Sequence, residues 1–304
     1  LTANWDGTVD SYQWSDDGSK VYFIAAIDGT KQLFEVNFPG MTRIAINVQQ
    51  ITKGDFDIND IVGFSGSKVI VTRGDMNHAA EIYSYDLKKK DWKQISNINT
   101  EDYKSLALSK TERRYVTTTD GKKMLVWVIL PPNFDASKKY PTLLYCQGGP
   151  QSALTQSYSF RWNFQLMAAN GYIVVAPNRR GMPGHGVEWN EQISGDWGGQ
   201  VMRDYLSAID DVAKEKYVDK DRLGCVGASY GGYSAFYLAG IHKNRFKTFI
   251  AHDGVFNTQS MFGTTEEVFF NNWDFGGAYW DKDNKVAQKS YNELNPITLV
   301  KNWN

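Results

Sequence analysis

The chain lacks the features that mark several classes of protein. Only 2 cysteines occur among 304 residues, too few for a disulfide framework or a zinc-binding set. Both Cys146 and Cys225 lie in stretches predicted to be core strands, so we expect buried free thiols. The longest apolar run, Met124–Leu130, has the length of a strand and falls well short of the ~20 residues of a membrane-spanning helix.

The chain also has no excess of positive or negative charge, because 33 Lys and Arg residues are balanced by 34 Asp and Glu residues. The sequence shows no basic stripe, and we therefore expect neither nucleic acid nor a membrane surface as a partner. No cluster of metal-ligating residues stands out, so no metal or cofactor is expected. The chain has no initiating Met and no signal peptide, which indicates that it starts inside a larger polypeptide or after processing.

Aromatic residues, in contrast, are plentiful at 14%, and the chain is long enough for two domains. From Trp5 to about Asn99 it reads as short alternating strands separated by turns, with a weak repeat of 48 residues that relates Ser19 to Ser67. A period of this length is typical of propeller blades. Since two blades cannot close a ring, residues 1–100 are predicted to be the last blades of a β-propeller; an independent small β-sandwich is the alternative.

Residues 101–304 are predicted to form an α/β domain. A hairpin at Asp120-Gly121 is followed by alternating buried strands and apolar-periodic helices, which favours a doubly wound, mainly parallel sheet opened by an antiparallel pair. The expected elements are strands at 113–119, 122–130, 140–146, 172–176 and 246–251, and helices at 160–169 and 197–216.

The most informative stretch surrounds Ser229. Gly227-Ala228-Ser229-Tyr230-Gly231 is a G-x-S-x-G pattern between an apolar strand and a helix, the context in which a serine nucleophile is presented on a sharp turn. Glycines are needed on both sides because strand and helix come too close for side chains. We therefore predict that Ser229 is a catalytic nucleophile; a Gly/Ser-rich turn without chemistry is the alternative.

Acyl transfer also needs two donors for the oxyanion. The N–H of Tyr230, the residue after the serine, is one candidate. Gly149 is our choice for the second, because the turn Gln147–Pro150 follows a predicted strand at the expected place; an ordinary loop is the alternative.

The general base is harder to place. In hydrolases with this elbow the chain order is Ser, acid, then His, and only His242 and His252 follow Ser229. His242 is predicted at the far end of the helix from Ser229, whereas His252 would have to precede its acid. A non-catalytic binding module therefore stays open as a reading, as does a carboxylesterase.

Four motifs together resemble the prolyl oligopeptidase family of serine peptidases. They are GASYGG at 227–232, QGGP at 147–150, NRRG at 178–181 followed by GHG at 184–186, and GDWGG at 195–199. Within the family, QGGP and GDWGG resemble the acylaminoacyl peptidase and dipeptidyl peptidase V branch more than the prolyl-specific one. The resemblance covers nearly the whole chain.

The resemblance implies a propeller that caps an α/β-hydrolase domain and admits short peptides, with Ser229 as nucleophile and Gly149 and Tyr230 as oxyanion donors. It places the catalytic Asp and His beyond Asn304, in the remainder of the same polypeptide, so that the hydrolase domain of this chain is expected to be incomplete at its C-terminal end. It also favours a periplasmic or secreted protein and allows a homodimer.

The wall of the pocket for the residue before the scissile bond is placed by the same resemblance after residue 251. Its candidate residues are Phe256, Met261, Phe262 and Trp273. Packing of these side chains under a loop is the equally open alternative.

Overall fold

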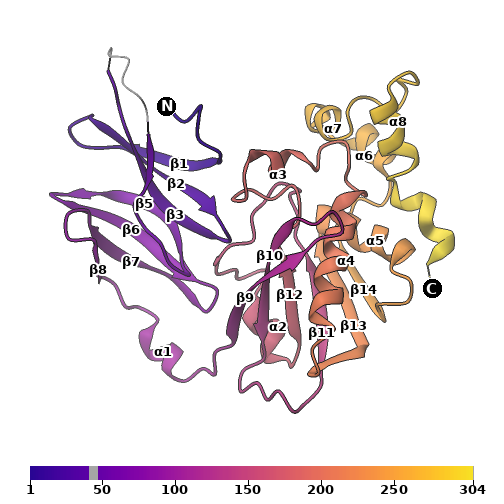
Figure 1. The fold of residues 1–304 in the computed structure, drawn as a ribbon, viewed down its shortest axis with the longest axis horizontal. Helices are drawn as coiled ribbons and strands as arrows, with labels where there is room; N and C mark the ends of the chain where they lie inside the picture. Colours follow the sequence, from indigo (N-terminus) through magenta and orange to yellow (C-terminus); the bar gives the residue numbers. More distant parts are fainter. Residues whose placement is uncertain (41–46, 304) are drawn as a thin grey trace. The chain divides into compact units, whose positions relative to one another are not determined.

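The computed structural model describes residues 1–40 and 47–303 (Figure 1). These residues form two compact units. Unit 1 consists of Leu1–Leu108, Ala153–Gln165 and Pro183–Val187, and unit 2 consists of Ser109–Ser152, Leu166–Met182 and Glu188–Asn304. Two short segments that the sequence placed with the α/β domain therefore cluster with the N-terminal unit.

Unit 1 contains two four-stranded antiparallel sheets in which each strand pairs with the next along the chain. The first sheet comprises β1 (Val9–Trp14), β2 (Lys20–Ile27), β3 (Thr30–Asn37) and β4 (Val48–Gln50); the second comprises β5 (Asp57–Ser65), β6 (Lys68–Asp75), β7 (His78–Asp86) and β8 (Asp91–Gln94), followed by α1 (Thr100–Lys104). Leu33 of the first sheet and Val69 of the second belong to one buried cluster. This is the paired-blade arrangement that the 48-residue repeat predicts.

A buried carboxylate explains why part of the segment Ala153–Gln165 belongs to unit 1. Asp57, at the start of β5, is 1% exposed. It accepts hydrogen bonds from the Lys31 N–H at 2.8 Å, from the Gln156 N–H at 3.1 Å and from the Thr155 hydroxyl. Burial raises the pKa of Asp57 to about 6, and the three hydrogen bonds oppose the rise. Sequence alone could not show that Asp57 binds Thr155 and Gln156, because these residues lie about a hundred positions further along the chain.

Unit 2 is built on one six-stranded sheet with the order β14-β13-β11-β12-β10-β9. Its strands are β9 (Lys110–Thr117), β10 (Lys123–Leu130), β11 (Tyr140–Cys146), β12 (Ile173–Pro177), β13 (Val218–Ala228) and β14 (Thr248–His252). β9 and β10 form the predicted antiparallel hairpin, β10 runs antiparallel to β12, and the remaining pairs are parallel. The predicted fold class is confirmed.

The helices predicted at residues 160–169 and 197–216 are shorter in the structure. The helices that follow α1 are α2 (Phe164–Ala169), α3 (Val187–Glu191), α4 (Gln200–Val212), α5 (Tyr230–Ile241), α6 (Thr258–Thr264), α7 (Val268–Asp274), α8 (Lys285–Asn292) and the 3-10 helix η1 (Pro296–Asn302). The predicted start of α4 at Trp197 was three residues early because the Asp196 carboxylate accepts the N–H of Gln200 at 2.9 Å and fixes the first turn there. The start predicted at Phe160 was likewise early by four residues.

The core of unit 2 joins the sheet to α4 and α5, with Val201, Tyr205 and Ile209 of α4 fully buried. Within the described ranges, no helix is both long and apolar enough to cross a bilayer. Cys146 and Cys225 are free and buried in this core, as expected, with their sulfur atoms 3.7 Å apart. Burial raises the pKa of the Cys146 thiol, which keeps it protonated and unreactive.

The pKa of Asp57 leads to a prediction about stability. Because the folded state holds this proton more tightly than the unfolded chain, the free energy of unfolding should fall as pH rises from about 4 to about 6. Asp57→Asn preserves the acceptor but cannot ionise. In chemical denaturation, the free energy of unfolding of Asp57→Asn should therefore rise relative to that of the wild type, by on the order of 2 kcal/mol, between pH 4 and pH 7.5.

Asp57→Ala serves as the control, since it leaves two N–H groups and a hydroxyl without their acceptor and should destabilise at every pH. Parallel pH profiles for the wild type and Asp57→Asn would contradict the assignment of a raised pKa.

Candidate active site

Ser229 lies on a strained turn between β13 and α5. Its φ of 56° and ψ of −121° lie outside the conformations common for a residue with a side chain. The strand ends at Ala228 and the helix starts at Tyr230, so the serine side chain stands at the carboxyl edge of the parallel strands and is exposed. This is the geometry of a nucleophile elbow.

The glycines of the motif are required by close backbone contacts. A Cβ atom on Gly231 would lie 2.0 Å from the Cys146 carbonyl oxygen, and one on Gly227 would lie 2.3 Å from the Gly231 carbonyl oxygen. Both distances are far below van der Waals contact. The absence of these two side chains lets the first turn of α5 pack directly against the end of β11.

The turn Gln147–Pro150 runs beside the serine. A Cβ atom on Gly148 would meet Ser229 Cβ at 3.6 Å and the Ala228 carbonyl oxygen at 3.0 Å. Gly149 has a φ of 126°, which favours glycine. The structure therefore brings together three of the predicted site residues, namely Ser229, Tyr230 and Gly149, where β11 and β13 end side by side.

The Tyr230 side chain makes two contacts with Trp197. The side chain is 1% exposed and its hydroxyl donates to the Trp197 carbonyl oxygen at 2.8 Å. Trp197, from the GDWGG motif, also packs edge-on against the Tyr230 ring at 4.9 Å. Two residues of GDWGG thus contact neighbouring elements: the Asp196 carboxylate accepts the N–H of Gln200 at the start of α4, and Trp197 packs against Tyr230, the residue after Ser229.

The chain has four histidines, and two of them, His242 and His252, belong to unit 2. His252 lies beside Ser229, since its carbonyl oxygen accepts the Ser229 N–H at 2.9 Å, but its ring pairs with Asp253 at 2.9 Å. His242 is buried at the opposite end of α5 and accepts the Phe246 N–H. His78 and His185 belong to unit 1. In the part of the chain that the structure describes, no histidine is hydrogen-bonded to the Ser229 hydroxyl.

The four aromatic and sulfur side chains predicted to line a specificity pocket are in different environments. Phe256 packs against Phe236 at 5.4 Å, whereas Phe262 is 7% exposed and contacts the rings of Tyr279 and Trp280. Met261 packs beside the unit 2 core, and Trp273 is 72% exposed. Phe256, Met261 and Phe262 therefore pack against other residues of unit 2, while Trp273 is exposed, and their role in a specificity pocket stays a prediction.

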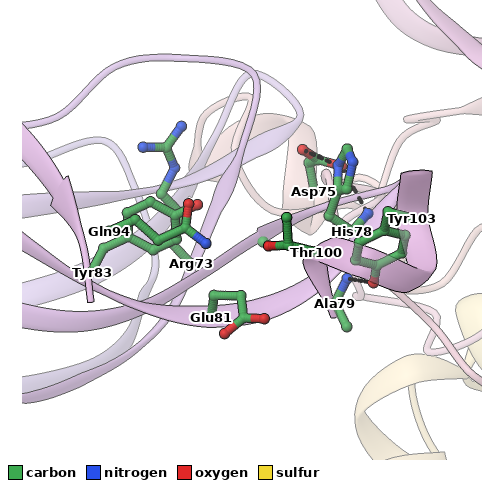
Figure 2. A pocket seen from close by; sticks show the side chains of 10 residues that line it. Arg73, Asp75, His78, Ala79, Glu81, Tyr83, Gln94, Thr100 and Tyr103 are labelled. Atoms are coloured by element: carbon green, nitrogen blue, oxygen red, sulfur yellow. Dashed lines mark hydrogen bonds and ion pairs between the residues drawn. The ribbon is translucent and has the colours of Figure 1, made fainter. Parts of the chain in front are cut away.

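A hollow of about 330 Å³ lies within unit 1 between β6, β7 and α1 (Figure 2). Figure 2 shows Asp75 and His78 close together at one side of it. His78 Nδ1 lies 2.8 Å from Asp75 Oδ1, and its ring packs edge-on against Tyr103. Neither Ser229 nor Gly149 is among the residues that line this hollow.

Arg179 is the site residue for which sequence reasoning predicted no role. It is the second residue after β12, its side chain is fully buried, and its guanidinium donates to carbonyl oxygens of the turn Gln147–Pro150. A signal was present in the sequence, since two arginines, Arg179 and Arg180, follow closely on a strand that is apolar throughout.

Comparisons with known proteins agree with the resemblance. Residues 158–304 match the prolyl oligopeptidase family. A dipeptidyl-peptidase 5 of Porphyromonas gingivalis is 47% identical over 303 residues, which cover 100% of this chain and 43% of the relative. A dipeptidyl-peptidase 5 of Porphyromonas endodontalis is 48% identical over 285 residues, which cover 93% of the chain and 40% of the relative. The chain therefore spans less than half the length of these relatives.

Solved structures show the same fold. An acylaminoacyl peptidase in complex with Z-Gly-Gly-Phe-chloromethyl ketone superposes with a TM-score of 0.86 at 22% identity, over 100% of this chain and 46% of that one. The acylaminoacyl peptidase of Pyrococcus horikoshii gives 0.85 at 23% identity over the same shares.

The close contact at Gly231 leads to a second prediction. Gly231→Ala should destabilise unit 2 by several kcal/mol, since α5 would have to move away from β11 to accept the methyl group. Gly263→Ala in α6 is a matched control because its Cβ would meet nothing within 4 Å, and it should be neutral or slightly stabilising. Thermal unfolding of both variants tests this; equal melting temperatures would contradict the packing described above.

Proposed function

The chain belongs to the prolyl oligopeptidase family, and on that premise we propose that it is the nucleophile-bearing part of a serine peptidase that cleaves short peptides. The observation that carries the proposal is the strained, exposed Ser229 at a strand end beside the turn Gln147–Pro150. A serine held in this way at the start of a helix is suited to attack a carbonyl group and has backbone N–H groups at hand for the oxyanion.

In the proposed reaction, Ser229 Oγ attacks the carbonyl carbon of the scissile peptide bond while a base removes the hydroxyl proton. The N–H groups of Tyr230 and Gly149 stabilise the oxyanion of the tetrahedral intermediate. The base then passes its proton to the leaving amine as the C–N bond breaks, and water hydrolyses the acyl-enzyme in the reverse sequence. We assign the base and its orienting acid to parts of the polypeptide outside these 304 residues, consistent with relatives that are more than twice as long.

The names of the relatives suggest the substrate class. We propose removal of dipeptides from the amino end of short peptides, with acylaminoacyl substrates as the competing class and simple carboxylic esters as a poorer one. Dipeptidyl, N-acetyl-aminoacyl and ester chromogenic substrates, compared by kcat/KM on the longest natural polypeptide that carries this chain, distinguish these classes.

Ser229→Ala tests the chemistry. In that polypeptide it should lower kcat by several orders of magnitude and abolish labelling by a fluorophosphonate, leaving the contributions of binding and the oxyanion donors. Ser207→Ala is the control, since Ser207 is a half-buried residue of α4 whose hydroxyl donates to the Arg203 carbonyl oxygen; it should behave as the wild type. Retention by Ser229→Ala of more than about a tenth of the activity would exclude Ser229 as the nucleophile.

A further inference from the structure

The carboxyl ends of β11 and β12 meet at one edge of the sheet, because the two strands are parallel neighbours. The residues that follow them, Gln147–Pro150 and Asn178–Gly181, must therefore pass close to each other. We propose that Arg179, in the second of these segments, is a positioning residue that holds both oxyanion donors in place. This inference rests on the proposed function.

The guanidinium of Arg179 spans the turn that contains Gly149. Nη2 donates to the Gln147 carbonyl oxygen at 3.2 Å, and Nη1 donates to the Pro150 carbonyl oxygen at 2.8 Å. These two carbonyl groups lie immediately before and immediately after the Gly148-Gly149 pair. A planar fork that fixes both ends of a short turn also limits the direction in which the Gly149 N–H points.

The same guanidinium also contacts the second donor residue. Its carbon lies 4.7 Å from the centre of the Tyr230 ring, within the range of a cation–π contact. The Tyr230 ring also packs edge-on against Trp197. One side chain thus links the turn after β11 to the residue after the nucleophile, although the two are about eighty positions apart.

The partners of Arg179 are unusual for a buried charge. The side chain is 0% exposed, and its remaining bonds go to the Tyr205 hydroxyl at 3.1 Å and the Arg180 carbonyl oxygen at 2.8 Å. Within the described ranges, no carboxylate forms an ion pair with it. A buried guanidinium stays charged and burying it is costly, so neutral dipoles and aromatic rings balance its charge. Lysine could not replace it, since an ammonium group cannot reach both ends of the turn in one plane.

Arg180 supplies the contrast. It is also buried, at 1% exposed, but it pairs with Asp120 and Asp204 and lies over the Trp189 ring. Among the described residues, its guanidinium forms no hydrogen bond with Gln147–Pro150 or with Tyr230. The two adjacent arginines are nearly equally buried, but the guanidinium of Arg179 contacts the turn and the Tyr230 ring, whereas that of Arg180 pairs with carboxylates.

The experiment compares Arg179→Lys with Arg180→Lys in the longest natural polypeptide that carries this chain, and Arg179→Met with Arg180→Met where the proteins fold. For Arg179→Lys we expect kcat on a dipeptidyl amide to fall about tenfold to a hundredfold with KM changed less than about threefold. Affinity for a peptide aldehyde, whose hemiacetal oxygen occupies the oxyanion position, should fall by a similar factor.

Arg180→Lys should lower the melting temperature at least as much as Arg179→Lys, with a smaller effect on kcat and on aldehyde affinity. Equal losses of kcat in both lysine variants, or unchanged aldehyde affinity in Arg179→Lys, would overturn the positioning role even with Ser229 confirmed as nucleophile. Should Ser229→Ala retain activity, the proposed function itself fails, which is a distinguishable result.

Discussion

The contact of backbone with backbone at the end of β11 is the constraint on which the site depends. The first turn of α5 lies so close to the Cys146 carbonyl oxygen that positions 227 and 231 cannot carry a side chain. The strain at Ser229 is the consequence, because the chain has to turn from strand to helix within one residue while it remains against β11. The buried, shape-complementary core of the sheet, α4 and α5 offsets that strain.

Polar groups buried around this contact give the site its geometry. Arg179 fixes the turn after β11 through carbonyl oxygens, and Arg180 fixes the segment after β12 through Asp204, whose carboxylate also accepts the Arg180 N–H at 3.1 Å. Burial raises the pKa of Asp204, while Gln200 and Arg180 act in the opposite direction. Two consecutive residues therefore carry charges that the core tolerates only because each has several fixed partners.

Much of the fold was readable from the sequence because it follows from local patterns. β11 and the start of α5 lie where the apolar strand and the G-x-S-x-G motif place them, and the 48-residue repeat anticipates the two four-stranded sheets. The elbow could be predicted since its glycines and serine are contiguous. Helix starts were less accurate because a single side chain, such as Asp196, decides them. The sequence could not show contacts between distant positions. The partners of Arg179 come together only in the folded parallel sheet. Asp57 likewise binds a segment that is far away in the sequence.

The residues that hold the candidate site in place differ in burial from the residue proposed to react. The side chains that hold the site, Arg179, Trp197 and Tyr205, are buried in unit 2, whereas Ser229 is exposed at its edge. An exposed serine is accessible to substrate and to a base from another part of the polypeptide. The proposed oxyanion donors are already held in place and need not move when substrate binds. Preorganised donors of this kind cost no rearrangement at the moment of reaction. Under the proposed function, these 304 residues supply the nucleophile Ser229 and the oxyanion donors Tyr230 and Gly149, and among the described residues no histidine is hydrogen-bonded to the Ser229 hydroxyl.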